Sequence, residues 1–188
     1  MIDKNAYSVA FNLIISDFKK ITYYIEPSDN HKIVYSHRIY ELFLRSCTEF
    51  ESVCRDLLTK EGYNKKTIDK TNICDYKELN KYYNYSELEI GLLYWQPKPL
   101  YIIPFDGWDK NSPPLKWYDS YNDVKHNRNS KFQKANFENL TLSIAGLFAL
   151  LAINHLFIMI DNFDSNIDLS KGRNESFYYD FLHSTLPK

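Results

Sequence analysis

The stretch SHRIYELFLRSCTEFESVCRDLLTKEG, residues 36–62, decides the fold class of this chain. Its apolar residues recur at intervals of three, four and seven, which is the spacing of one continuous stripe along an α-helix. Ser36 is a suitable N-cap residue, and Gly62 is placed to end the helix. We therefore expect a long amphipathic helix whose buried stripe consists of Ile39, Leu42, Phe43, Cys47, Phe50, Val53, Cys54, Leu57 and Leu58.

Other segments on either side of this helix have helical patterns as well. Residues 6–25, 114–126 and 136–160 are expected to be helices, with a shorter one around 76–83. Residues 87–104 differ, because two short apolar runs flank the prolines at positions 97 and 99. Short connections between long amphipathic helices favour an all-α fold. The prediction is an antiparallel helical bundle with a short β-like hairpin insertion around 87–104.

Length and charge limit the possible classes of protein. The chain has 188 residues, a length typical of one domain, and we expect a single domain over 1–188. Its helical core is predicted at about 6–160, followed by a polar C-terminal tail at 161–188. With 23 Lys and Arg against 24 Asp and Glu, the net charge is −1. A surface that is basic all round is therefore excluded, and any nucleic-acid contact must come from a local patch.

Three cysteines at irregular spacing do not form a disulfide framework, which favours a reducing, cytoplasmic location. The five histidines show no HxxxH spacing, the cysteines form no CxxC pair, and phosphate-loop motifs are absent from the sequence. We therefore expect neither a metal site nor a cofactor.

Residues 140–160 form a run of 21 residues without a charge, long enough for a membrane-spanning helix. Against a membrane span are Thr141, Ser143, Asn154 and His155, which are costly in lipid unless they are paired. We favour a buried core helix and no membrane contact. A surface this apolar is more than a small bundle needs, so we expect a second copy of the chain to cover part of it in a homodimer.

The segment from Trp117 to Lys134 carries the candidate chemistry. On a helix, Tyr118, Asn122 and His126 form one stripe, and Trp117, Tyr121 and Lys125 form the next. Four cations, with no acidic residue between them, follow within ten positions, namely Lys125, Arg128, Lys131 and Lys134.

An imidazole beside an amide and several cations suits phosphate-ester chemistry, because histidine exchanges protons near neutral pH and cations stabilise developing negative charge. The alternative is purely structural, since cations are also favoured at the C-terminal end of a helix.

The order of elements and this segment resemble the HEPN superfamily. The ribonuclease motif of that family is an arginine, usually followed by a polar residue, with four to six residues before a histidine. Here Asn122 and His126 match the polar residue and the histidine, whereas Tyr121 stands where the motif has arginine. The resemblance covers about 36–160 in architecture and about a dozen residues in sequence.

The resemblance implies an all-α, often dimeric domain that binds RNA or cleaves it without metal, in a toxin–antitoxin or phage-defence system with an antitoxin or other partner protein. The catalytic candidates are then His126, Asn122 and Arg128, where Arg128 can replace the motif arginine only if the helix ends near His126. The substrate-binding candidates are Lys125, Tyr121, Trp117, Lys131 and Lys134. The competing hypothesis is a helical protein-interaction or regulatory module without chemistry.

Overall fold

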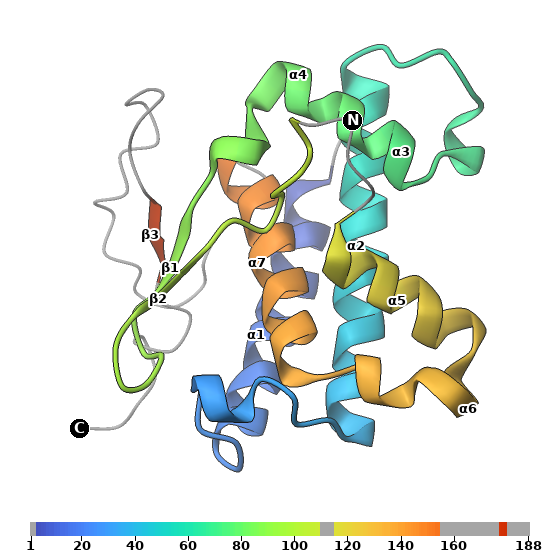
Figure 1. Ribbon diagram of the computed structural model, residues 1–188. Helices are drawn as coiled ribbons and strands as arrows, with labels where there is room; N and C mark the ends of the chain where they lie inside the picture. Colours follow the sequence, from blue (N-terminus) through green and yellow to red (C-terminus); the bar gives the residue numbers. More distant parts are fainter. Residues whose placement is uncertain (1–2, 110–114, 155–176, 180–188) are drawn as a thin grey trace.

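Helices dominate the computed structural model, which describes residues 3–109, 115–154 and 177–179. Three long helices form its centre, namely α1 (Lys4–Thr22), α2 (His37–Lys60) and α7 (Phe137–Ile153). A fourth, α5 (Lys116–His126), lies beside α2 and α7 (Figure 1). The predicted helical fold is confirmed in this coarse sense.

Helix α2 forms where the sequence predicts it. The Ser36 hydroxyl accepts a hydrogen bond from the backbone N–H of Ile39 at 3.2 Å and so caps the N-terminus. At the other end Gly62 adopts φ +74°, a backbone conformation that residues other than glycine rarely adopt. All nine residues of the predicted stripe are buried.

The helix directions differ in part from the prediction. Phe11 stacks on Phe148 and Phe18 stacks on Phe137, with ring centroids 6.1 and 5.6 Å apart, so α1 and α7 are antiparallel. By contrast α2 and α7 are parallel, because their first turns lie together and the buried hydroxyls of Ser46 and Ser143 meet at 2.6 Å. The long connection between α2 and α7 returns the chain to the end where α2 begins, which allows this arrangement (Figure 1).

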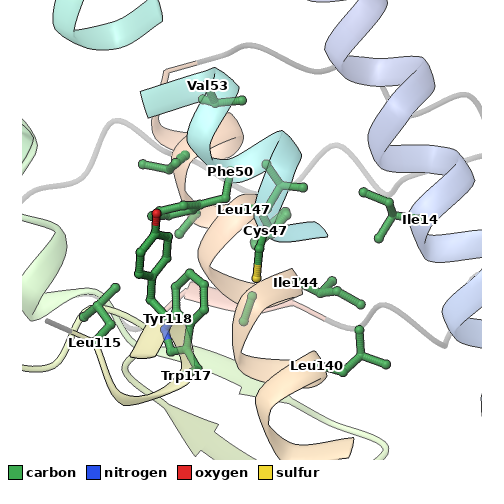
Figure 2. Close-up of a cluster of buried hydrophobic side chains, with 14 of the residues drawn as sticks. Ile14, Cys47, Phe50, Val53, Leu115, Trp117, Tyr118, Leu140, Ile144 and Leu147 are labelled. Carbon is green, nitrogen blue, oxygen red and sulfur yellow. The ribbon is translucent and has the colours of Figure 1, made fainter. Parts of the chain in front are cut away.

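An aromatic core fills the space between α2, α5 and α7 (Figure 2). Phe50 is fully buried, and the Trp117 ring meets it edge-on with centroids 5.1 Å apart. Phe105 and Trp108 approach Phe50 from the segment that precedes α5. Much of the aromatic content of the chain therefore serves packing.

Short elements connect the long helices. The structure has η1 (Asp29–His31), η2 (Ile68–Lys70), α3 (Ile73–Tyr76), η3 (Lys77–Leu79), α4 (Asn80–Tyr83) and η4 (Tyr85–Glu87). The predicted hairpin is confirmed, since β1 (Ile90–Leu92) pairs antiparallel with β2 (Leu100–Ile102). On its other edge β1 pairs in parallel with β3 (Phe177–Tyr179), which belongs to the predicted tail. The rest of that tail lies outside the described residues.

Helix α7 is buried over almost its whole length within one chain. A second copy of the chain is therefore not needed to cover this helix. Its neighbours α1, α2 and α5 cover it instead. Asn154 Nδ2 donates a hydrogen bond to the Tyr85 hydroxyl at 2.6 Å. His155 and the rest of the apolar run to residue 160 lie outside the described residues. Within 3–109, 115–154 and 177–179, no helix is both long and apolar enough to cross a membrane.

Candidate functional site

The end of α5 decides how the candidate residues are placed. The helix stops at His126, because Asn127 leaves helical geometry with φ −140° and ψ 54°. The chain then turns into α6 (Arg128–Lys131) and η5 (Phe132–Lys134), between the helices predicted at 114–126 and 136–160. In a continuing helix Arg128 would point away from the motif stripe, so this break meets the condition stated above for Arg128.

Two of the predicted substrate-binding residues lie in the core. Trp117 and Tyr121 are each 2 % exposed, and Trp117 Nε1 donates a hydrogen bond to the Pro104 carbonyl at 2.8 Å. Their stripe of α5 packs against α2 and α7, which is the ordinary reason for aromatic residues at helical spacing. At this burial neither ring can stack on a base or bind a ligand.

Lys125 is bound to the chain itself. Its Nζ donates to the Tyr121 hydroxyl at 3.0 Å and lies 4.0 Å from Glu51 Oε1. The same Glu51 oxygen accepts a 2.6 Å hydrogen bond from the buried Tyr118 hydroxyl. The hydrogen bond with Tyr121 raises the pKa of Lys125, whereas burial raises the pKa of Tyr121. This polar layer fixes α5 on α2, so Lys125 is less available to a ligand than its charge indicates.

Lys134 is paired as well, since its ammonium group contacts the Asp123 carboxylate. That hydrogen bond lowers the pKa of Asp123, and the charge of Lys131 adds a smaller effect. Lys131 itself is half-buried on α6. Two of the four predicted cations are thus partly neutralised, Lys125 by Glu51 on α2 and Lys134 by Asp123 on α5.

Asn122 and His126 keep the arrangement that the sequence predicts. They lie one turn apart on α5, with Asn122 half-buried and His126 exposed at the helix end. Neither side chain makes a hydrogen bond to another residue in the described part of the chain. Both therefore remain open to a ligand.

Arg128 makes contacts that the sequence does not predict. Its guanidinium carbon lies 4.9 Å from the Tyr40 ring centroid and 5.6 Å from that of Phe132. One of its nitrogens, Nη2, lies 3.1 Å from Nδ1 of His37, in the first turn of α2. His37 and Arg128 are 91 positions apart, and no local pattern could have joined them. The arginine thus meets an imidazole, but that of His37 on another helix.

No known protein family, curated protein or solved structure matches the chain. Within the residues that the structure describes, no group of three or more His, Cys, Asp or Glu side chains is arranged to hold a metal ion. The function must therefore be argued from the geometry of the exposed side chains.

Proposed function

We propose that this protein binds RNA through the surface formed by the end of α5, by α6 and by the first turn of α2. This "α5–α6 surface" comprises His126, Arg128, Lys131 and His37. The observation that carries the proposal is the state of Arg128, which is exposed, stacked on two rings and paired with no carboxylate in the described part of the chain. A guanidinium held in one orientation loses less freedom when it binds phosphate.

Neighbouring cations lack this property. Arg38 pairs with Glu41 at 3.0 Å, and Arg45 pairs with Asp17 at 2.6 Å. An arginine that is already bound to a carboxylate must give up that partner before it binds a phosphate group. Arg128 has no such cost, because its partners in the described part of the chain are two aromatic rings and an imidazole nitrogen.

The test is fluorescence anisotropy of a labelled single-stranded RNA with the purified chain in EDTA. Arg128→Gln should weaken binding roughly tenfold, in line with the loss of one charged hydrogen-bonding group. The matched control is Lys81→Gln on α4, at the opposite end of the molecule (Figure 1), where Lys81 pairs with Glu78. If the unaltered chain does not bind RNA, or if the two variants lose equal affinity, the proposal fails.

Salt dependence gives an independent readout. Each phosphate contact on a single strand contributes a slope of about −0.7 to the dependence of log affinity on log salt. Arg128→Gln should therefore reduce the slope by about 0.7, whereas Lys81→Gln should leave it unchanged. An affinity that is flat across salt concentrations excludes backbone contacts.

Metal-independent cleavage of the bound RNA, as in the HEPN superfamily, is the second part of this proposal. In that reaction the 2′-hydroxyl attacks the neighbouring phosphorus, the P–O5′ bond breaks, and one proton leaves the 2′ oxygen while another reaches O5′. His126 would exchange a proton, and Asn122 would orient its imidazole or a phosphate oxygen. His126→Ala should abolish cleavage in EDTA while RNA binding persists. If the unaltered chain binds RNA but leaves it intact, the cleavage part of the proposal fails and the binding part remains. A role in a toxin–antitoxin or phage-defence system is what the HEPN resemblance implies for such a ribonuclease.

A second candidate function, a protein-interaction module, is favoured by a cleft between α1 and α2. This cleft measures about 840 Å³, and its lining includes the apolar side chains of Ile21, Ile25 and Leu42. Tyr24 also lines the cleft, with 90 % of its surface exposed. A hollow and a projecting ring on one face can pack against the same face of a second copy, since a twofold interface must be self-complementary. We therefore propose a homodimer through this cleft.

Sedimentation velocity over a range of concentrations tests the second candidate. The unaltered chain should sediment as a dimer, and Tyr24→Asp should convert it to a monomer. The control is Tyr82→Asp on α4, an exposed tyrosine outside the cleft. A chain that is monomeric at all concentrations, or a dimer that both variants leave intact, overturns this use of the cleft.

A further inference from the structure

The contact between Arg128 and His37 favours one tautomer of the imidazole. A guanidinium only donates hydrogen bonds, so Nδ1 of His37, 3.1 Å from Arg128 Nη2, must accept. The proton of the neutral ring is then on Nε2, which becomes a donor. His37 and Arg128 are both exposed, so they can offer N–H groups to one ligand. Two adjacent donors without a carboxylate partner suit the oxygens of a phosphate group.

An exposed aromatic ring lies next to these donors. Tyr35 is 51 % exposed, and its ring meets Phe132 edge-on with centroids 5.7 Å apart. The Phe132 and His37 rings are also in contact, with centroids 4.9 Å apart, and the Arg128 guanidinium lies over the Phe132 ring. Phe132 is therefore the shared support that keeps Tyr35, His37 and Arg128 together.

The backbone at Tyr35 is fixed as well. Tyr35 pairs with Asn136 in an isolated β-bridge, and the Phe137 N–H donates to the Val34 carbonyl at 2.8 Å. These contacts join the segment before α2 to the start of α7. The Tyr35 ring is thus held on a rigid part of the chain, where a base can stack without first ordering a loop.

We propose that Tyr35, His37 and Arg128 form a subsite for one unpaired nucleotide of RNA. The phosphate binds to Arg128 and to Nε2 of His37, while the base stacks on Tyr35. Bases within a duplex are already stacked on both faces, so only an unpaired base can use this ring. The inference rests on the proposed RNA binding and adds a substrate class and two residues outside the predicted motif.

Tyrosine variants test the stacking half of the subsite. Stacking on one aromatic ring contributes enough that Tyr35→Leu should weaken single-stranded RNA binding about fivefold or more. Tyr35→Trp should retain or strengthen it. The control is Tyr82→Leu, because Tyr82 is equally exposed at 55 % and also contacts one neighbouring ring, yet lies on α4. Affinity for a duplex of the same sequence should not change in Tyr35→Leu.

Histidine and arginine variants test the phosphate half. His37→Ala should weaken binding about fivefold or more, since the lost donor serves a charged group. His37→Gln keeps an N–H at a similar position and should restore part of the affinity. The double variant His37→Ala/Arg128→Gln should lose less than the sum of the two single effects, because both residues act on one phosphate. His126→Ala, which removes the other exposed imidazole of the surface, should affect binding less than His37→Ala.

The outcomes separate the two proposals. If the unaltered chain binds no RNA, the proposed function fails and the subsite fails with it. If the chain binds RNA and Arg128→Gln weakens binding, but Tyr35→Leu and His37→Ala behave like Tyr82→Leu, only the subsite is overturned. Equal losses on duplex and single-stranded RNA in Tyr35→Leu also overturn it. Thermal unfolding of each variant shows whether the fold is kept, and Tyr35→Trp and His37→Gln serve where a smaller side chain unfolds the protein.

Discussion

Tyr118→Phe removes one oxygen from the polar layer between α5 and α2 and leaves the ring in place. The Tyr118 hydroxyl donates to Glu51 at 2.6 Å, and the Glu51 side chain is only 13 % exposed. A hydrogen bond to a charged group contributes about 1.5–3 kcal/mol when its loss leaves the partner buried. Lys125 at 4.0 Å and Arg55 at 3.7 Å remain near the carboxylate and reduce the loss. We expect the free energy of unfolding to fall by about 2 kcal/mol.

Urea unfolding followed by tryptophan fluorescence measures this change, and the melting temperature should fall by about 4–8 °C for a chain of this size. The control is Tyr82→Phe on α4, since Tyr82 is 55 % exposed and lies outside the proposed interface, so it should change stability by less than about 0.5 kcal/mol. In the Tyr118→Phe background, Glu51→Gln should cost much less than it does alone. Equal effects of Tyr118→Phe and Tyr82→Phe would refute the reasoning, because water or the two cations would then satisfy Glu51.

Further expectations concern the core and its titrating groups. Phe50→Ala should lower the free energy of unfolding by about 3–5 kcal/mol in the same urea assay, because it empties the centre of the aromatic core, and a loss below about 1 kcal/mol contradicts this. Gly146→Leu should cost about 1–3 kcal/mol, since a Cβ there would already lie 3.2 Å from Trp117 Cζ2, and an unchanged stability would show that the ring can move. Burial raises the pKa of Tyr76 from 10.0 to about 12, so the folded state keeps a proton that the unfolded state releases. Stability should therefore be full below pH 10.0, decline as the pH rises to about 12, and show less of this decline in Tyr76→Phe. Burial also raises the pKa of the Cys47 and Cys54 thiols, so only the exposed Cys74 should react rapidly with a thiol reagent in the native protein.

The helices could be predicted because their causes are local. The apolar stripe of residues 36–62, the capping Ser36 and the terminating Gly62 all act within a few turns, and each has the predicted role in α2. The hairpin at 90–102 follows in the same way from two short apolar runs around the prolines. Helix directions could not be predicted equally well, since the parallel packing of α2 and α7 depends on where the long connection returns.

The candidate site could be predicted in its position along the chain but not in its contacts. The sequence identifies the segment from Trp117 to Lys134, and the structure leaves Asn122 and His126 open on α5, whereas Tyr118 of the same predicted stripe is buried. However, an aromatic residue on a helix has the same local pattern whether it faces a core or a ligand. The burial of Trp117 and Tyr121 depends on where α2 and α7 lie, which is not encoded in that segment alone.

By itself, the sequence determined the amphipathic helices, the hairpin and the break of the α5 helix near His126, because backbone propensity and apolar periodicity act between near neighbours. Only the tertiary structure decided which cations are bound and which are open. Lys134 is paired with Asp123, and Lys125 lies 4.0 Å from Glu51 on α2, whereas Arg128 stacks on Tyr40 and Phe132 and reaches His37. A charge interacts with whatever group the fold brings within a few ångströms, and the packing of α6 on the first turn of α2 brings His37 to Arg128.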